Sequence, residues 1–151
     1  MSPTTAQHSY SIKDAAVLTG LPASTLRYYE SIGVITPISR GASSKHRVYD
    51  DNDLDQLTWI ACLAATGMSV ADMKQYVANR ALGPAAADDQ VALLVEQQQR
   101  LAREAEHLAL RQQYVGLKIA YWQAVAAGED DRAATVGDEA RALADDLKRT
   151  K

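Results

Sequence analysis

Ser24-Thr25-Leu26-Arg27-Tyr28-Tyr29-Glu30, which ends at Gly33, is the stretch that decides the fold of this chain. It reads as a short helix. A first helical segment, Ile12 to Thr19, precedes it and is closed by Gly20-Leu21-Pro22. Two short helices joined by so tight a turn form a helix-turn-helix pattern. The second helix of such a pair fits the major groove of DNA, so the sequence predicts a DNA-binding element here.

The side chains of the second helix are expected to divide into two faces. Leu26 and Tyr29 lie three residues apart, share one face and should point into the core. Three side chains are left to face outward: Ser24, Arg27 and Tyr28. A guanidinium can bond guanine through two hydrogen bonds or clamp a phosphate, and a phenol can donate to a phosphate. The alternative for Arg27 is an ion pair with Glu30.

A basic segment follows the two helices, Arg40-Gly41-Ala42-Ser43-Ser44-Lys45-His46-Arg47-Val48-Tyr49. It reads as a hairpin whose tip carries positive charge. A cationic loop beside a helix-turn-helix is suited to grip the backbone phosphates of DNA. The sequence therefore predicts a wing next to the second helix.

The composition is that of a folded globular protein. Of the 151 residues, 47% are hydrophobic and 23% are charged. No apolar run approaches the roughly 20 residues needed to cross a bilayer, and the first residues lack a basic-then-apolar leader. The one cysteine excludes an internal disulfide framework. These features predict a cytoplasmic protein.

Charge is distributed unevenly along the chain. The formal net charge is -3, which by itself argues against a nucleic-acid binder. Residues 1–50, however, hold five lysines and arginines against three carboxylates, so the rest of the chain carries the negative excess. A weakly basic head on an acidic body is compatible with local contact to DNA phosphates.

Two further helices complete the predicted head, residues 10–80. Asp50-Asp51-Asn52 offer N-cap side chains for a helix that contains Trp59 and should stop at Gly67. Ser69 can cap the next helix. The buried stripe of that helix would hold Val70, Met73, Tyr76 and Val77. Trp59 is expected to pack in the core or between the head and a helix.

A long helix is predicted over residues 85–123, with Gly116 as its one breaker. Every seventh residue from Leu94 to Trp122 is apolar, and a companion row three residues earlier runs from Val91 to Ile119. This spacing is the signature of a coiled coil. The residues expected to pair across the seam are Val91, Leu94, Leu101, Leu108, Val115, Ile119 and Trp122.

Two arrangements could cover this seam. A helix of about 35 residues extends ~50 Å, more than a small head can cover, so a second copy of the chain is the simpler partner. The sequence thus predicts a homodimer. The alternative is an intramolecular hairpin with the acidic tail. Residues 129–148 of that tail form a predicted amphipathic helix with the apolar positions Val136, Ala140, Leu143 and Leu147.

The motifs of the head, taken in order, strongly resemble the MerR family of transcription regulators. The resemblance covers Tyr10 to about Val77, and the long helix stands where the family has its dimerisation helix. The motifs that carry it are Thr25-Leu26-Arg27-Tyr28-Tyr29-Glu30, Gly33-Val34-Ile35, Pro37, Arg47-Val48-Tyr49 and Gly67-Met68-Ser69. Family wings commonly read Gly-Tyr-Arg-x-Tyr, whereas here Lys45-His46 precede Arg47.

The resemblance implies a winged helix-turn-helix head and an antiparallel coiled coil between two subunits. It also implies binding to a pseudo-palindromic promoter, whose distortion realigns promoter elements for RNA polymerase. A change of state in response to an effector requires different affinities for the two states. The residues expected to contact DNA are Ser24, Thr25, Arg27, Tyr28, Arg40, Lys45, His46, Arg47 and Tyr49.

The cysteine count limits the effector. Metal-sensing members of the family use several cysteines around the ends of the dimerisation helix, whereas this chain has one in total. Thiolate chelation of a metal and ligation of an iron–sulfur cluster are therefore not expected, and the sequence predicts no metal and no cofactor. Drug-sensing members carry a large C-terminal domain, and the 29 residues after Trp122 are too few for one.

Cys62 is the remaining sensor candidate. Ile60-Ala61-Cys62-Leu63 and Thr66-Gly67-Met68-Ser69 are similar to the branch of the family that responds to aldehydes and nitric oxide through one cysteine, as is Lys118-Ile119-Ala120-Tyr121. The resemblance thus suggests a small electrophile as effector. The reactive species is the thiolate, so sensing requires a nearby cation or helix N-terminus that lowers the pKa of the thiol. The alternative role for Cys62 is that of a small buried apolar residue. The alternative function for the protein is that of a repressor or architectural protein that responds to no effector.

Other kinds of site find less support in the sequence. Tyr114, Tyr121 and Trp122 lie near the end of the long helix, where they could line a ligand pocket or close the end of a dimer. The chain has no glycine-rich phosphate loop, no paired catalytic carboxylates and no nucleophile-plus-histidine arrangement with supporting spacing. The sequence therefore predicts no enzyme.

Overall fold

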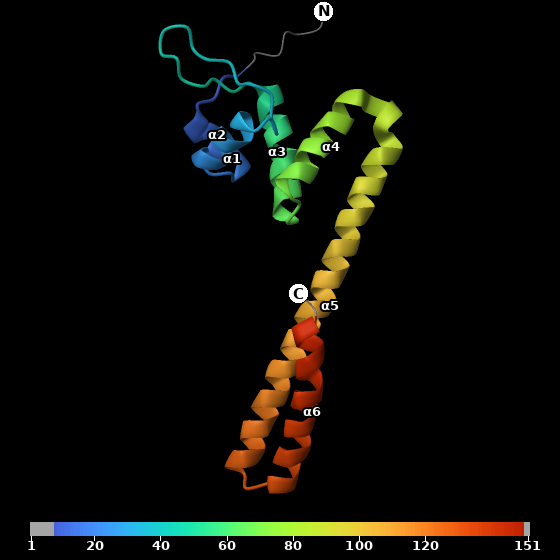
Figure 1. Cartoon of the computed structure of the whole chain (residues 1–151). Coiled ribbons are helices and arrows are strands. Elements are labelled where there is room, and N and C mark those ends of the chain that lie inside the picture. The colour runs from blue at the N-terminus through green and yellow to red at the C-terminus, as the bar shows by residue number, and fades with distance from the viewer. Residues whose placement is uncertain (1–7, 150–151) are drawn as a thin grey trace, which may run out of the picture. The chain divides into compact units, whose positions relative to one another are not determined.

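The computed structural model describes residues 8–149, and the fold is mainly α, as the sequence predicts. The helices, in chain order, are α1 (Ile12–Thr19), α2 (Ala23–Ser31), α3 (Asp51–Ala65), α4 (Val70–Leu82), the 3₁₀ turn η1 (Gly83–Ala86), α5 (Ala87–Ala126) and α6 (Asp130–Arg149) (Figure 1). The chain forms two compact units, one up to Leu94 and one from Val95. Within the described range, no helix is both long and apolar enough to span a membrane.

Short-range capping defines the two helices of the helix-turn-helix. Ser11 Oγ accepts from the backbone N–H of Asp14 at 3.1 Å, and the Asp14 carboxylate accepts from the backbone N–H of Ser11 at 3.2 Å, which is a capping box. At the other end of α1, Gly20 has a left-handed backbone with φ 76°. Gly33, with φ 82°, follows α2 in the same way. The capping residue and the glycines that predict these two helices from the sequence therefore mark their ends in the structure.

The same chemistry starts the next two helices. Asp50 is the N-cap of α3, and its side chain and that of Asp53 form a second capping box. Ser69 Oγ accepts from the backbone N–H of Asp72 at 3.1 Å and caps α4. Each cap of this kind stabilises a helix by about 1 kcal/mol.

The core of the first unit lies between α1, α2, α3 and α4. Leu26 and Tyr29 are buried in it, as their spacing predicts. Trp59 is half-buried and packs against this core. Its ring lies 5.4 Å from that of Tyr76 and 4.8 Å below the guanidinium of Arg80. The fully buried larger side chains are Tyr49, Leu26, Leu57, Ile60, Met73 and Val34.

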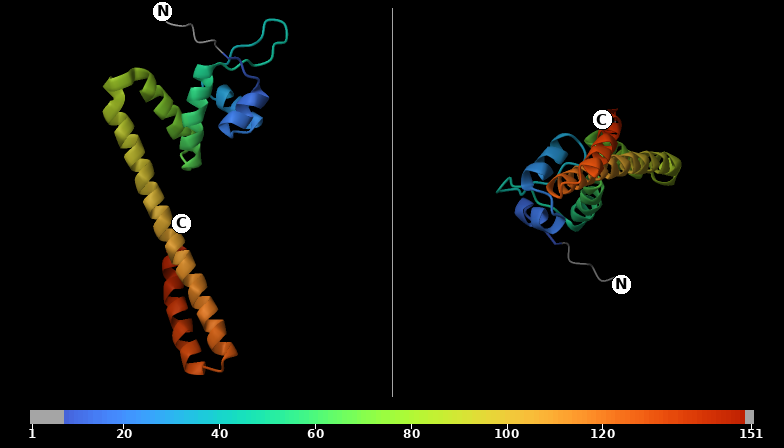
Figure 2. Two further views of the ribbon diagram at one scale, coloured as in Figure 1. Left: turned by 180° about the vertical axis from the view of Figure 1, so that it is seen from behind. Right: turned by 90° about the horizontal axis from the view of Figure 1, so that it is seen from below.

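In the second unit, α6 folds back antiparallel along the C-terminal part of α5 (Figures 1 and 2). Gly128, with φ 71°, makes the turn, and the backbone N–H of Glu129 donates to the carbonyl of Ala124 at 2.9 Å. The side chains that are buried between the two helices are small: Ala124, Ala133, Val136 and Ala140. Small residues allow two helices to approach closely. The intramolecular hairpin that was one alternative for the tail is thus present.

The hairpin does not cover the predicted seam. The half-buried residues in this part of α5 include a row of four, Leu110, Tyr114, Leu117 and Tyr121, and Tyr121 lies beside Gly137 of α6. At about 100° per residue, this row lies on the opposite side of α5 from the seam. All seven predicted seam residues stay exposed: Val91, Leu94, Leu101, Leu108, Val115, Ile119 and Trp122. The hairpin therefore leaves the face that carries the predicted seam open, so it does not exclude a partner helix there.

Gly137 offers a test of the hairpin. It lies in the middle of α6, and a Cβ added to it would lie 3.6 Å from the Tyr121 ring, an ordinary van der Waals contact. Because glycine costs about 1 kcal/mol in a helix interior, Gly137→Ala should raise the free energy of unfolding of the hairpin by roughly that amount. Thermal denaturation followed by circular dichroism measures the change.

Gly33→Ala is the matched control for that substitution. Its φ of 82° lies in the left-handed region, so the same exchange there should destabilise the protein by about 1 kcal/mol. A loss of stability in Gly137→Ala would mean that α6 packs on α5 in another register.

Candidate DNA interface

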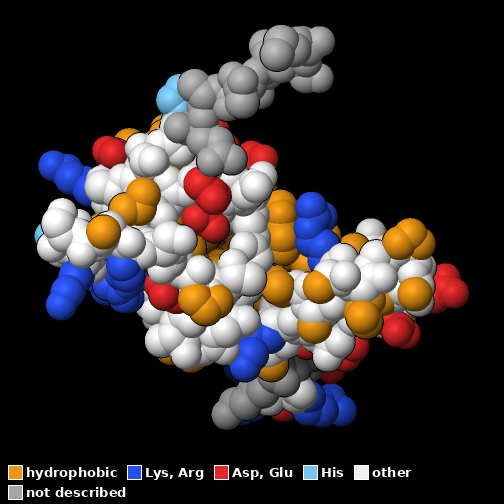
Figure 3. Space-filling view, turned by 90° about the horizontal axis from the view of Figure 1, so that it is seen from above, with side chains coloured by type: hydrophobic (Ala, Val, Ile, Leu, Met, Phe, Trp, Pro, Cys, Tyr) orange, Lys and Arg blue, Asp and Glu red, His pale blue; other side chains and the backbone are white. Residues whose placement is uncertain are grey.

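The outward face of α2 carries the side chains that the sequence assigns to DNA. Ser24, Arg27 and Tyr28 are exposed, Tyr28 with 51% of its surface accessible. Their predicted orientation is confirmed. Thr25, also a predicted contact, is half-buried. Figure 3 shows lysine and arginine side chains gathered along the edge of the head that the wing forms.

Glu30 pairs with the wing and not with Arg27. Arg47 Nε lies 2.7 Å from Glu30 Oε1, and the two side chains are only 20% and 14% exposed. The alternative in which Glu30 neutralises Arg27 is therefore wrong. Arg27 takes part in none of the ion pairs found between residues 8 and 149. Its guanidinium remains available for a phosphate or a base edge.

Glu30 also fixes the start of the wing. Its second carboxylate oxygen accepts from the backbone N–H of Ile38 at 3.4 Å. One carboxylate at the end of α2 thus holds both ends of the loop that follows. Arg47 serves as an anchor in this arrangement, with less of its charge free for DNA than the sequence suggested. Sequence reasoning missed Glu30 as a positioning residue, because its partner lies 17 residues away.

The wing is a hairpin-like loop with two isolated bridges, Arg40 to Arg47 and Tyr10 to Tyr49. The backbone N–H of Gly41 donates to the carbonyl of His46 at 2.9 Å. Lys45 has φ 58°, which marks the sharp turn of the tip. Three predicted phosphate contacts are exposed on the wing: Arg40, Lys45 and His46. Their placement is compatible with the predicted grip.

Tyr49 does not lie on the outer face of the wing. Its side chain is 0% exposed, and its hydroxyl has no hydrogen-bond partner within the described part of the chain. Burial raises the pKa of its phenol, so the ring stays neutral. The backbone of Tyr49 pairs with that of Tyr10 through two 2.8 Å hydrogen bonds. The prediction that Tyr49 contacts DNA is therefore wrong, because its packing against the core places it at the base of the wing.

A cationic cleft of about 280 Å³ opens between α1, α2 and the wing. It joins the N-terminal end of α1 to cationic side chains from three elements, α1, α2 and the wing. Its lining residues are Ser11, Ile12, Lys13, Arg27, Arg40, His46 and Arg47. Such a set is suited to a phosphate group. Lys13 was not among the predicted contacts, since nothing in the sequence brings α1 next to the wing.

Cys62 is exposed on α3, so the alternative in which it is a small buried packing residue is wrong. Exposure meets one requirement of a reactive thiol. In the region from residue 8 to 149, no three His, Cys, Asp or Glu side chains gather in a way that could hold a metal ion.

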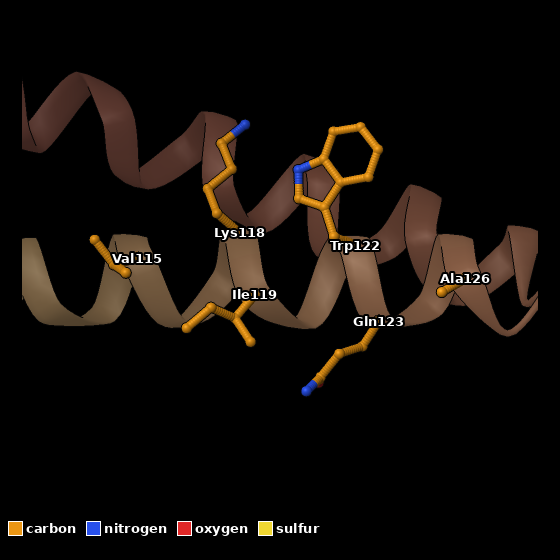
Figure 4. A pocket seen from close by; sticks show the side chains of 6 residues that line it. All are labelled: Val115, Lys118, Ile119, Trp122, Gln123 and Ala126. Atoms are coloured by element: carbon orange, nitrogen blue, oxygen red, sulfur yellow. The ribbon is translucent and has the colours of Figure 1, made fainter.

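The aromatic residues at the end of α5 do not share one pocket. Tyr114 and Tyr121 lie on the half-buried row of α5, whereas Trp122 is 63% exposed on the seam. An open apolar patch surrounds Trp122. It is lined from α5 alone by Val115, Lys118, Ile119, Trp122, Gln123 and Ala126 (Figure 4). This patch continues the seam to the end of α5.

Comparison with known proteins places the geometry in a family. The model of the MerR HTH family of regulatory proteins matches residues 10–80, which hold the helix-turn-helix, the wing, α3 and most of α4. An uncharacterised HTH-type transcriptional regulator of Pseudomonas aeruginosa is 33% identical over 98 residues, which are 65% of this chain and 74% of that protein. The chain belongs to the MerR family. The HTH-type transcriptional regulator AdhR of Bacillus subtilis is 34% identical over 82 residues, and the match spans 54% of this chain and 58% of AdhR.

Solved MerR structures agree with the fold over most of the chain. HiNmlR, a MerR family regulator lacking the sensor domain and bound to promoter DNA, superposes with a TM-score of 0.66 at 27% identity. The match covers 85% of this chain and 96% of HiNmlR. A MerR family protein from Listeria monocytogenes gives the same TM-score at 26% identity, over 85% of this chain and 98% of that one. The helix-turn-helix head and the long helix are therefore shared with the family.

Proposed function

We propose that this chain is a sequence-specific transcription regulator of the MerR type, which binds a pseudo-palindromic promoter and alters transcription by distorting the DNA. The observation that carries the proposal is the cationic cleft, in which α1, α2 and the wing present one surface to a phosphate backbone. The relationship to HiNmlR, which is bound to promoter DNA, supports it. No enzymatic activity is part of the proposal, and the site of action is the cytoplasm.

The proposed regulator is a homodimer. Seven apolar side chains of α5 are exposed on the face opposite α6, at the spacing of a coiled-coil seam. A second copy of the same helix is the partner that this spacing fits. In the proposed division, residues 10–80 bind DNA, residues 85–123 dimerise, and residues 129–148 form the C-terminal amphipathic helix that packs on α5.

The proposed mechanism follows from DNA mechanics. A dimer whose two heads have a fixed separation can bend or untwist the DNA between half-sites, at a cost of a few kcal/mol. The free energy of the DNA contacts made by both heads would offset the cost of the distortion. The distortion would realign promoter elements for RNA polymerase, the proposed protein partner on the promoter. Within each head, we assign Ser24, Thr25, Arg27 and Tyr28 to the groove, and Arg40, Lys45 and His46 to phosphates.

Selection from random DNA tests this function. Duplexes retained by the purified protein should converge on one sequence with inverted half-sites, and its affinity should fall steeply with salt concentration. A library that yields no enriched sequence would refute sequence-specific binding. Permanganate reactivity of unpaired thymines in the bound duplex reports the distortion.

The effector is a separate part of the proposal. We assign the response to a small electrophile through the exposed thiol of Cys62. Promoter transcription in vitro should change on addition of formaldehyde with the parent protein, and Cys62→Ser should abolish that change while leaving operator affinity untouched. An equal response of the two proteins would remove Cys62 as the sensor. A promoter that responds to no electrophile would favour the alternative of an effector-independent repressor or architectural protein.

A further inference from the structure

The corner between α4 and α5 is closed by a chain of amide hydrogen bonds. Gln75 Nε2 donates to Asn79 Oδ1 at 2.8 Å, and Asn79 Nδ2 donates to Gln90 Oε1 at 3.1 Å. Gln90 Nε2 then donates to the backbone carbonyl of Tyr76 at 3.1 Å. These four residues are called the corner clamp below. They join two turns of α4 to the first turn of α5.

Burial makes the clamp selective for one geometry. Asn79 is only 4% exposed, so water cannot replace partners that its amide loses. A buried amide left without its partners loses stabilising free energy, because nothing replaces the hydrogen bonds it made. Hydrogen bonds also require a narrow range of distance and direction. The clamp therefore favours one relative placement of α4 and the start of α5.

The backbone of the corner restricts movement in the same place (Figure 1). Gly83 has φ 68° and ψ -144°, a combination that only glycine adopts readily. Pro84 follows with a fixed φ at the start of η1, and Ala86 is buried. A short 3₁₀ turn thus separates the two helices, and the hydrogen bonds of the corner clamp connect α4 to α5 across this turn.

We propose that the corner clamp sets the angle at which α5 leaves α4, and through it the separation of half-sites that the dimer accepts. The proposal rests on the proposed function, in which the two heads are connected through α5. The seam lies along α5 and the DNA-binding surface lies before α4, so this joint transmits head position to the dimer. A change of angle at the joint moves the two reading surfaces relative to one another.

The test uses the duplex recovered by selection with the parent protein, together with versions that have one or two base pairs added or removed between the half-sites. Each added base pair turns one half-site by about 35° relative to the other. The parent should prefer one spacing. In Gln90→Met, which keeps the side-chain length and removes both bonds across the corner, that preference should fall by about tenfold.

The matched control is Gln99→Met, the same exchange at an exposed position of the same helix. It should keep the parent's dependence on spacing. Affinity for a single half-site should be equal in all three proteins, because both substituted residues, Gln90 and Gln99, lie outside the head. Gln90→Glu is a second variant that keeps the acceptor for Asn79 and loses only the donor to Tyr76, and it should also lose preference.

The possible results distinguish a failure of the corner clamp from a failure of DNA binding. A parent-like dependence on spacing in Gln90→Met and Gln90→Glu would overturn the clamp while leaving DNA binding intact. A parent protein that enriches no duplex refutes the proposed function, and the clamp proposal falls with it. Poor folding of Gln90→Met, seen as lost helicity, leaves Gln90→Glu to decide.

Discussion

Leu101→Asp combined with Leu108→Asp is expected to turn the protein into monomers. The two leucines are 38% and 51% exposed and face away from α6, so they contribute little to the folding of a single chain. In the proposed dimer they would meet the partner helix, and the four carboxylates of the double variant would be buried without partners, which is strongly unfavourable. Sedimentation equilibrium should report a single subunit mass.

The same variant should lose at least about 100-fold in affinity for the selected duplex, because a monomer engages one half-site and the bivalent advantage disappears. Gln99→Asp combined with Gln113→Asp is the control. It adds the same charges to exposed positions of α5 outside the seam and should remain dimeric. A double leucine variant that persists as a dimer would show that the subunits associate through another face.

The features of the fold that the sequence predicts correctly are those set by interactions between residues close together in the chain. The helix boundaries follow from caps and glycines that act over three or four residues, such as Ser11 before α1 and Ser69 before α4. The inward direction of Leu26 and Tyr29 follows from helical periodicity. Several spaced motifs in order then identify the family. These features are readable because both partners lie close together in the sequence.

Long-range pairing explains what the sequence could not predict. Glu30 has two cations within reach in principle, and only the folded chain shows that Arg47 is its partner. Tyr49 stands among the basic residues of the wing, yet the pairing of its backbone with Tyr10 turns it into the core. Lys13 reaches the cleft only because α1 packs beside α2. In each case the deciding neighbour lies well beyond one helical turn along the chain.

The two apolar rows of α5 illustrate a different difficulty. Heptad spacing identifies one row, the predicted seam from Val91 to Trp122, and this row is exposed. The same helix carries a second apolar row, which includes Leu110, Tyr114 and Leu117, and heptad spacing alone does not distinguish the two. If α5 had a single apolar row, that row could be covered either by a second subunit or by α6, but not by both. Two rows on opposite sides of the helix make that choice unnecessary.

Arg27→Ala should weaken binding to the selected duplex by roughly 1–3 kcal/mol, a loss of about 5- to 150-fold. Arg27 is exposed on the outward face of α2, lines the cationic cleft and belongs to none of the ion pairs within residues 8–149. Its guanidinium is therefore available to contact DNA. Fluorescence anisotropy with a labelled duplex measures the loss.

Arg27→Lys separates the two possible contacts. A lysine keeps the charge and loses the paired donors that match guanine, so a base contact predicts a large loss in Arg27→Lys and relaxed sequence preference. A phosphate contact predicts near-parent affinity in Arg27→Lys. It also predicts that the salt slope falls by about one unit in Arg27→Ala. Lys74→Ala, which removes an exposed charge on α4, is the control and should leave affinity unchanged. Parent-like affinity and salt dependence in Arg27→Ala would mean that α2 does not present this residue to DNA.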